Sequence, residues 1–489
     1  MAELETFGAI VLVAALGLVV AILSNRVSER LHVPAPAIFF GLAVLAAAVY
    51  PDLAELPLVG TEEIVTVAVA AILFDGGMHI GLNRLRESLG VIAATGVLGT
   101  FLTAGAVALV VHTLFGFDWW VAVLLGTAIA PTDPAVVFSV LGRREIGGRA
   151  GTILEGESGA NDPVGIALLV SLLAAGGVSL GAWGDVAGTF ALQMIVGTAI
   201  GIIGGLATLW FMRNVPLPSE ALYPLRALAS GFVVYGLATV LHGSGFLAIF
   251  VAGIVLGDER APYKGEVERF TSAIASLSEV VAFVALGLTV DVDVLVDSDV
   301  WLTGILIGAI VTFVVRPIVV GAVLLPFGLG RNERLFVLWS GLKGAVPLLL
   351  GILVLDEQVP DAERVYGIVI VVVIMSVLLQ GTLVPTAASL LSIPMRMREP
   401  EPWALGVRLR HEPNGVHRLE VAARSVAAGT RIEDLPISSD DVWVSFVVRR
   451  RRLVTVRGDT VLEPGDEALI LADPALHDEL VSMFTTASR

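Results

Sequence analysis

Residues 120–141 read WVAVLLGTAIAPTDPAVVFSVL, an apolar stretch long enough to cross a bilayer, with an acid between two prolines at its centre. Pro131 and Pro134 remove two amide donors and obstruct the helical ladder, which leaves carbonyl oxygens unpaired. Such a break is tolerated at membrane depth only where it lines a cavity or packs against protein. The alternative is a simple proline kink, but the acid between the prolines argues against it. With Thr132 and Asp133 at its centre, the stretch predicts a broken helix whose freed carbonyls coordinate a cation.

The whole chain has the composition of a membrane protein. Of its 489 residues, 56% are hydrophobic and 16% are charged, and the mean hydropathy is +0.87. Soluble domains carry about 25% charged residues. The chain has no cysteine, which excludes disulfides, zinc–thiolate sites, iron–sulfur clusters and thiol nucleophiles. The first apolar run, residues 7–23, is preceded by acids instead of a basic segment, so we expect a retained span and not a signal peptide.

Thirteen apolar stretches are predicted to span the membrane, near residues 7–23, 34–50, 64–80, 89–112, 120–141, 152–177, 186–212, 222–241, 245–257, 270–290, 300–326, 334–355 and 364–391. If successive spans alternate in direction, one set of loops carries fifteen basic residues and the other carries only Arg364. Cytoplasmic loops carry the excess of Lys and Arg. We therefore expect the N-terminus outside and the C-terminus in the cytoplasm.

The sixth predicted span holds the strongest candidate for a transport site. Residues 156–163 read GESGANDP, and Ser158 and Asp162 share one helix face because they lie four residues apart. Glu157 and Asn161 share the adjacent face. If the helix begins near Thr152, Asp162 lies about 15 Å along it, near the middle of the bilayer. A buried carboxylate there is costly unless it binds a proton or a cation, which is what exchange requires. A hydrogen-bonded structural cluster is the alternative, above all for Asn161 and Glu157.

Three further charged side chains inside predicted spans are candidates for functional residues. Asp75 stands before paired glycines in Leu73–Gly77, and it is either an interfacial cap or an inward-facing ligand. Arg316 precedes a proline, and Lys343 lies in the run GLKGAVP. Both cations should pair with a carboxylate or with helix-terminal carbonyls. The run around Lys343 predicts a second broken helix seven spans after the first, running the opposite way as inverted repeats require.

The last 90 or so residues change character. Charge density rises after Pro394, and short alternating runs follow at 419–422, 442–448, 453–456 and 468–471, separated by turn signals such as EPGD. This pattern predicts a small β-rich domain that ends in a short helix. No catalytic motif is visible in it, and a ligand-sensing or dimerising appendage is expected.

These motifs, in this order, resemble the monovalent cation:proton antiporter-1 family, which includes the NhaP-type prokaryotic exchangers. The resemblance covers about residues 7–391 and rests on LFDGG, TDP, ESGAND, Arg316 and GLKGA. The tail resembles the TrkA-C or RCK-C regulatory domain, which is typical of the potassium/proton, cell-volume-regulation branch. We therefore divide the chain into a transmembrane antiporter domain, 1–395, and a cytoplasmic regulatory domain, 396–489.

The resemblance implies an all-α polytopic fold of about thirteen spans, NhaA-like, with inverted repeats, two broken helices and a small α/β domain at the C-terminus. It implies elevator-type exchange of Na⁺ or K⁺ for H⁺ in a prokaryotic cytoplasmic membrane, in pH, cation and volume homeostasis. Membrane lipid and a second copy of the chain are the expected partners, with a nucleotide-type ligand on the tail. No nucleic acid, cofactor or enzymatic activity is expected. The transported ions are the substrates.

The same resemblance assigns roles to individual residues. The cation and proton would bind at Asp162, with Ser158, Asp75 and the carbonyl of Thr132 completing the cation shell and Asp133 contributing near the crossing of the broken helices. Glu157 and Arg316 would form a stabilising pair, Asn161 would orient the site, and Lys343 stands where many relatives have arginine, which leaves its pairing open. Some relatives have glutamate at the position of Asp75. Asn161 in place of a second aspartate favours electroneutral exchange of one cation for one proton.

Three other classes of membrane protein are alternatives to an antiporter. A sodium-coupled symporter of a small organic anion could share the inverted-repeat architecture, whereas a channel would need a filter-like segment that the sequence lacks. An intramembrane aspartyl protease also needs two buried aspartates. Its nearest motif here is VLGD, residues 255–258, which lacks the first glycine of the Gly-x-Gly-Asp pattern and places Asp258 at a span end.

Overall fold

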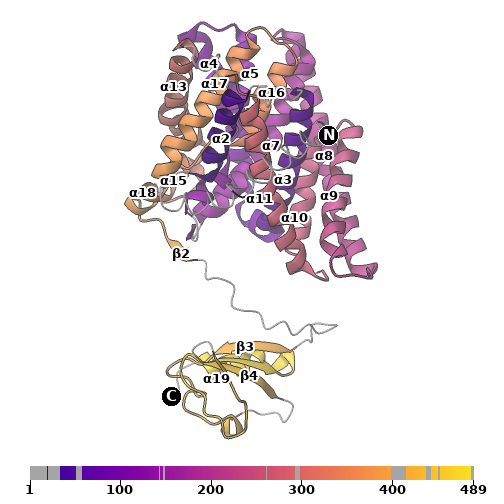
Figure 1. Cartoon of the computed structure of the whole chain (residues 1–489), viewed down its shortest axis with the longest axis vertical. Helices are drawn as coiled ribbons and strands as arrows, with labels where there is room; N and C mark the ends of the chain where they lie inside the picture. Colours follow the sequence, from indigo (N-terminus) through magenta and orange to yellow (C-terminus); the bar gives the residue numbers. More distant parts are fainter. Residues whose placement is uncertain are drawn as a thin grey trace. The chain divides into compact units, whose positions relative to one another are not determined.

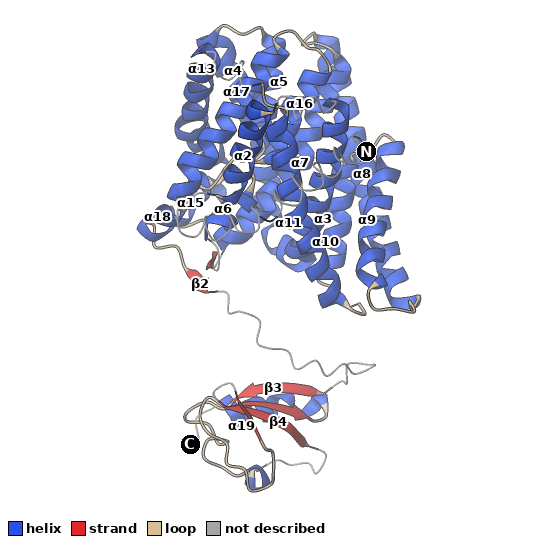
Figure 2. Ribbon diagram, in the orientation of Figure 1, coloured by secondary structure: helices blue, strands red, loops and turns tan. Residues whose placement is uncertain are grey.

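The computed structural model describes residues 19, 34–50, 58–141, 144–146, 149–259, 261–291, 298–397, 415–436, 442–449 and 452–485. The chain divides into two compact units, Met1–Glu399 and Pro400–Arg489. Within the described residues, the first unit is helical apart from one short pair of strands, and the second contains a four-stranded sheet (Figure 2).

The first unit is a bundle of long helices (Figure 1). Its first half contains α2 (Ala35–Val49), α3 (Leu58–Ala93), α4 (Gly99–Phe115), α5 (Trp119–Ile129), α6 (Pro134–Leu141), α7 (Arg149–Ala175) and α8 (Leu180–Asn214). Its second half contains α9 (Leu222–Val240), α10 (Gly245–Gly257), α11 (Lys264–Leu288), α13 (Ser298–Ile310), α14 (Arg316–Val323), α15 (Arg331–Trp339), α16 (Ala345–Asp356), α17 (Ala362–Met375) and α18 (Thr382–Leu390). Strand β1 (Arg144–Ile146) pairs antiparallel with β2 (Met395–Met397).

Eight helical segments in the described part are long and apolar enough to cross a membrane, and α2, α10 and α16 are shorter apolar helices. The chain is therefore a polytopic α-helical membrane protein. Each predicted span from residue 34 onward falls on a helix or a pair of helices. The predicted span at 7–23 falls almost entirely outside the described residues, so the count of thirteen stays a prediction.

Both predicted interruptions are present in the structure. Helix α5 ends at Ile129 and α6 begins at Pro134, and α15 ends at Trp339 while α16 begins at Ala345. Proline at a first helical position costs no hydrogen bond, because that amide has no partner within the helix. Pro134, one of the two prolines that break the ladder of the first span, thus also starts its second half.

The helices of this unit form two packing groups. Helix α3 packs mainly on α10 and α11, and α2, α8 and α9 join the same group through α11 and α10. In the other group α4 packs on α5, and α17 packs on α13 and α16. Helix α7 packs on both α3 and α5 and so joins the two groups.

Close contact between α3 and α10 depends on glycine. A Cβ on Gly77 would lie 2.3 Å from the carbonyl oxygen of Phe250, and one on Gly253 would lie 2.4 Å from that of Phe74. Small residues let transmembrane helices approach until their backbones touch. Of the paired glycines after Asp75, Gly77 faces α10, whereas a Cβ on Gly76 would meet no atom within 4 Å.

In the part of the chain that the structure describes, three π-helical turns interrupt the long helices: η2 (Ala94–Leu98), η3 (Val311–Val315) and η5 (Ser376–Gly381). Turn η2 packs on α7, where a Cβ on Gly96 would lie 3.1 Å from the carbonyl oxygen of Glu157. Turn η3 ends directly before Arg316. π-Turns are frequent at functional sites because they change which side chains face a neighbour.

The second unit is a small sheet with a helix packed on it. Its strands are β3 (Val416–Glu420), β4 (Trp443–Arg449), β5 (Arg452–Val454) and β6 (Glu467–Leu471), in the order β3-β6-β4-β5 with antiparallel pairing throughout. Helix α19 (His477–Thr485) buries Leu480 and Phe484 in a core shared with Val447 and Ile470. The structure thus places strands at the four alternating runs of the tail.

One buried charge in this unit gives its stability a pH dependence. Asp466 is fully buried, and both of its carboxylate oxygens accept hydrogen bonds at 2.8 Å from the Arg449 guanidinium. Burial alone would raise the pKa of Asp466, but the hydrogen bonds from Arg449 and from the backbone of Glu463, together with the charge of Arg449, lower it below its ordinary value. A carboxyl whose pKa is lower in the folded state stabilises the fold above its unfolded pKa of about 3.9.

This contribution is fully present near neutral pH and is lost as the pH falls through the folded pKa of Asp466. We therefore expect hydrogen exchange in β4 and β6, corrected for the intrinsic rate, to accelerate below about pH 4 in the full chain. Asp466→Asn should exchange faster at neutral pH and show a weaker acid transition. Equal acid transitions in the two proteins would contradict this assignment.

Candidate functional site

The two interrupted spans meet at their breaks. The backbone amide of Asp133, between α5 and α6, donates a hydrogen bond of 2.8 Å to the carbonyl oxygen of Leu342, between α15 and α16. Leu342 is fully buried and Thr132 is 5% exposed. Two extended segments from distant parts of the sequence therefore cross inside the protein, and four half-helices end around one point.

Asp133 lies at two helix N-termini. Its Oδ1 accepts a hydrogen bond of 2.8 Å from the amide of Ala135 in the first turn of α6. The backbone of Ala345, the first residue of α16, also hydrogen-bonds this carboxylate. Helix N-termini carry partial positive charge and unpaired amides. One carboxylate thus balances the positive ends of both half-helices.

Lys343 balances the opposite end of the first break. Its Nζ donates hydrogen bonds of 3.1 Å to the carbonyl oxygens of Ala130 and of Pro131, where α5 ends. These carbonyls have no partner within their helix, and a cation near a helix C-terminus is favourable. The side chain is 4% exposed, so the carbonyls and nearby carboxylates replace water around the ammonium.

Arg316 likewise places a positive charge against the free carbonyl oxygens at the C-terminal end of α15. Its Nε and Nη2 donate to the carbonyl oxygens of Leu338 and Val337 at 3.0 and 3.1 Å, and its Nη1 lies 2.8 Å from Oε1 of Glu157. The side chains of Arg316 and Glu157 are 6% and 3% exposed. The structure therefore contains the pair that the family resemblance implies, and it links α7 to the second broken span.

Asn161 connects α7 to the first break. Its Nδ2 donates a hydrogen bond of 2.8 Å to Oγ1 of Thr132, and its Oδ1 accepts one of 3.3 Å from the Thr132 amide. All polar atoms of the Asn161 amide thus face one residue of the extended segment. The arrangement fixes the orientation of Thr132 and sets α7 against the crossing.

Asp162 is the next residue along α7, and it lies among charges without a hydrogen bond to its Oδ1 in the described part of the chain. It is 8% exposed, and Ser158, one turn earlier, is 3% exposed. Its electrostatic neighbours are Asp133 and Lys343. A buried carboxylate oxygen without a partner is costly, so this position favours binding of a proton or a cation.

Asp75 belongs to a separate set of contacts. Its Oδ1 accepts a hydrogen bond of 2.9 Å from the hydroxyl of Ser272 on α11, and its Oδ2 lies 3.4 Å from Nδ1 of His79. The structure thus places Asp75 against α11, whereas Asp162, Thr132 and Asn161 gather at the crossing. Its predicted role as a cation ligand remains a prediction.

Position 344 has room only for glycine, because the carboxylate of Asp133 occupies the space of a Cβ. A Cβ there would lie 1.8 Å from Oδ2 of Asp133, closer than any real contact. We expect Gly344→Ala to displace Asp133 from the two helix ends, which lowers the melting temperature and abolishes ion exchange. Overpacking of this kind costs about 1–3 kcal/mol or more.

A matched control is Gly105→Ala in α4, where a Cβ would meet no atom within 4 Å. This variant should keep both melting temperature and ion exchange. Measurements of both quantities on the purified pair test the prediction, and normal exchange by Gly344→Ala would contradict it.

The family described as "Sodium/hydrogen exchanger, transmembrane" matches residues 10–389. The chain belongs to this family. As a sodium/hydrogen exchanger it is a cation:proton antiporter, a transporter and not an enzyme, and the ions it exchanges are substrates that need no cofactor. The predicted family is confirmed, and the aspartyl protease alternative, with Asp258, is set aside.

Two curated K(+)/H(+) antiporters match nearly the whole exchanger, and a Na(+)/H(+) antiporter matches two thirds of it. The exchanger is 30% identical to the K(+)/H(+) antiporter NhaP2 of Shewanella oneidensis over 498 residues, which cover 99% of this chain and 85% of the relative. It is 29% identical to the K(+)/H(+) antiporter NhaP of Alkalimonas amylolytica, with the same coverage. The Na(+)/H(+) antiporter NhaP of Pseudomonas aeruginosa is 28% identical and covers 66% of this chain and 79% of that protein.

The fold has a solved counterpart. The sodium proton antiporter MjNhaP1 of Methanocaldococcus jannaschii superimposes with a TM-score of 0.64 at 20% identity, covering 75% of this exchanger and 97% of that chain. At this identity the likeness concerns the fold alone. It supports a multi-pass helical membrane protein.

Several polar residues at the crossing were missed by the sequence interpretation. Oγ of Ser376, in η5, accepts a hydrogen bond of 3.0 Å from the amide of Lys343 and donates one of 2.8 Å to Gln380. Gln380 in turn donates to the carbonyl oxygen of Trp339 at the end of α15. A single Ser or Gln in an apolar span is a weak signal. Glu279 in α11 was also missed, although it is the only charged residue in 270–290.

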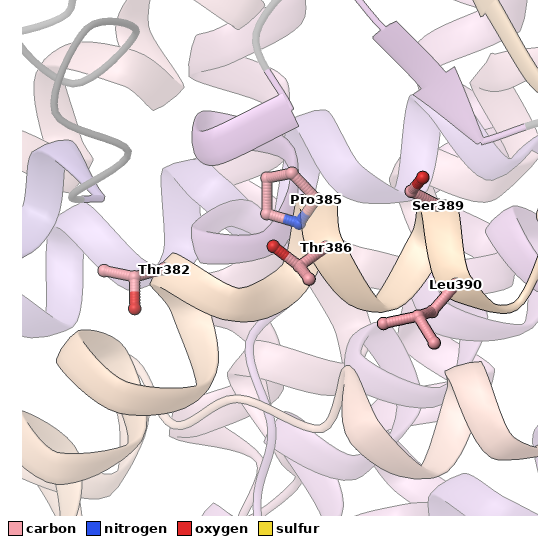
Figure 3. Close-up of a pocket in the computed structure, with 5 residues that line it drawn as sticks. All are labelled: Thr382, Pro385, Thr386, Ser389 and Leu390. Carbon is pink, nitrogen blue, oxygen red and sulfur yellow. The ribbon is translucent and has the colours of Figure 1, made fainter.

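A hollow on the surface of α18 lies apart from this site. It has a volume of about 540 Å³ and is lined by Thr382, Pro385, Thr386, Ser389 and Leu390 (Figure 3). None of these side chains is ionisable. It therefore offers no charge to balance a cation, and we assign it no part in exchange.

Proposed function

We propose that the exchanger moves K⁺ or Na⁺ against H⁺ through Asp162, which binds the proton and the cation in turn. The observation that carries this proposal is the buried Oδ1 of Asp162, which has no hydrogen-bond partner in the described residues, beside the crossing of two broken helices. Freed carbonyls and half-helix ends coordinate cations in secondary transporters. Asp162 is therefore the ligand at which proton and cation compete.

The remaining cation ligands are assigned by position. Ser158 lies one turn before Asp162 on α7, and Thr132 is held by Asn161 beside the same helix. We assign the Thr132 carbonyl, the Ser158 hydroxyl and Asp133 to the group that carries the ion. Asp75, on α3, completes the shell from the opposing group of helices.

We favour K⁺ as the preferred cation. The relatives named K(+)/H(+) antiporters match 99% of this chain, including the tail, whereas the one named a Na(+)/H(+) antiporter matches 66%. The tail, residues 396–489, is then a cytoplasmic regulatory domain of the TrkA-C type. Its compact core and separate sheet support an independent domain.

The proposed movement is an elevator. Helices α4 to α7 and α13 to α18 carry the crossing and Asp162, and α2, α3 and α8 to α11 form the opposing group, which would stay fixed and hold the homodimer together. The two packing groups and the inverted order of the broken spans support this division. With one carboxylate exchanging at the site, and Asn161 beside it, one cation replaces one proton and turnover is electroneutral. The N-terminus lies outside and the tail in the cytoplasm.

The test is a pH-gradient assay in everted membrane vesicles, titrated separately with K⁺, Na⁺ and Li⁺. We expect each active cation to collapse an imposed gradient when it is added alone, with K⁺ effective at the lowest concentration. A requirement for an organic anion would identify a symporter instead. A membrane potential generated during turnover would contradict electroneutral exchange.

A further inference from the structure

Glu279 is a carboxylate at membrane depth that the site described above does not use. It lies in the middle of α11, and its Oε1 is inaccessible to water and has no hydrogen-bond partner in the part of the chain that the structure describes. The two neighbouring turns of the helix carry no other charged residue. An ionisable group of this kind is expensive in a membrane protein unless it serves the ion pathway.

The surroundings of Glu279 offer no described counter-cation. Helix α11 packs on α2, α3, α9 and α16. Helix α2 carries no charged residue. On α3, Arg86 is exposed and His79 contacts Asp75. The cation of α9, Arg226, donates to the carbonyl oxygens that end α8. Arg316 and Lys343 are held by Glu157 and by the carbonyls of α5. The charged group that interacts electrostatically with Glu279 is another carboxylate, Asp133.

The position of Glu279 on α11 relates it to both halves of the site. Ser272, which hydrogen-bonds Asp75, lies seven residues earlier and therefore on nearly the same helix face. Helix α11 belongs to the group of α3 and α10, whereas Asp133 belongs to the group that carries the crossing. Helix α11, which carries Glu279, packs on α16, whose first residue hydrogen-bonds Asp133, and Glu279 interacts electrostatically with Asp133.

Two neighbouring carboxylates without a cation between them repel each other, and burial strengthens the repulsion. The transported ions can supply the positive charge that the described residues do not provide. A proton or a transported cation can neutralise Glu279, and an entering cation would find there an oxygen ligand with no competing hydrogen bond.

We propose that Glu279 is a second cation-binding carboxylate, which holds the transported ion before it passes to Asp162. The protonated carboxyl of Glu279 releases its proton to the side from which the cation enters. When the cation moves on to Asp162, Glu279 takes up the proton that Asp162 gives up, so charge is conserved. The same ion visits both carboxylates, and the exchange of one cation for one proton is unchanged. This inference rests on the proposed function, because the ion is the one exchanged at Asp162.

The test compares Glu279→Gln with the wild type in proteoliposomes that contain the full chain. We expect the half-saturating concentration of K⁺ to rise roughly tenfold, equivalent to about 1.4 kcal/mol, while the maximal rate at saturating K⁺ is largely kept. Glu279→Asp should recover part of the affinity, because it restores the carboxylate at a shorter reach. A purely structural role would lower the amount of folded protein and the maximal rate without this split.

Glu266→Gln is the matched control, because it is the same substitution on the same helix at a side chain that is 43% exposed. It should leave the K⁺ dependence unchanged. If the wild type and Glu279→Gln have equal half-saturating concentrations, the inference is wrong while the proposed function stands. If the wild type moves no protons on addition of any cation, the proposed function itself fails. If Glu279→Gln is folded and has lost its maximal rate at unchanged affinity, Glu279 does not bind the cation.

Discussion

Asp162→Asn should reduce cation-driven proton movement to the level of empty vesicles. Asparagine has almost the same shape as aspartate, but it holds neither a proton that can be exchanged nor a negative charge that can bind a cation. Because Oδ1 of Asp162 accepts no hydrogen bond from the described residues, the substitution should leave the surrounding contacts of Thr132 and Asn161 in place. The variant should therefore keep the melting temperature of the wild type.

The assay is the collapse of an imposed pH gradient in proteoliposomes, followed on addition of K⁺ or Na⁺. Asp185→Asn, at an exposed position of α8, is the matched control and should exchange normally. Asp162→Glu keeps the carboxylate but moves it by one methylene group, so we expect weak exchange with an altered cation preference. Cation-driven proton movement by Asp162→Asn at the wild-type rate would exclude Asp162 as the exchanging group.

The sequence predicted well the positions where a proline or a charged residue interrupts an apolar run. Pro131 and Pro134 interrupt an apolar run, and in the structure α5 ends at Ile129, two residues before Pro131, and α6 begins at Pro134. Asp162 is an acid in such a run, and burial together with an unpaired oxygen follows in the structure. Likewise, the alternating runs of the tail fall on strands, because a sheet with one buried face requires a period of two.

Other features depend on contacts between residues far apart in the sequence. Local sequence patterns do not predict such contacts. Ser272 and Asp75 are 197 residues apart, and nothing near either residue predicts their hydrogen bond. The position of Lys343 between the carbonyls of α5 follows only from the crossing, so the sequence left its partner open. The π-turns beside the site also need tertiary packing. Glu279 is different, because its charge within an apolar run was visible and was overlooked.

The second large effect is expected at the buried pair of Arg316 and Glu157. Arg316→Met removes the only guanidinium that contacts Glu157 in the described residues and leaves the carbonyls of Val337 and Leu338 without their donors. Removing one partner of a buried ion pair costs about 3–5 kcal/mol, because the other charge stays buried. We therefore expect a large fall in melting temperature and the loss of exchange.

Arg316→Lys should restore little of either property. The three contacts of Arg316 use three different nitrogens that point to Glu157 and to two carbonyls of α15. A lysine ammonium is a single point charge and cannot reach them in the same geometry. Melting curves and the pH-gradient assay on this variant measure how far stability and ion exchange depend on the shape of the guanidinium and how far on its charge.

The double variant Glu157→Gln/Arg316→Met separates stability from transport. Without Arg316 a buried carboxylate is uncompensated, so removing that charge as well should recover part of the melting temperature. Exchange should not recover, because no donor then holds the end of α15 against α7, and α15 leads directly into the segment of Leu342 and Lys343 that meets Asp133. Recovery of both melting temperature and exchange would mean that Arg316 and Glu157 only neutralise each other and do not position the second broken span. Recovery of stability alone would show that Arg316 positions the second broken span at the crossing.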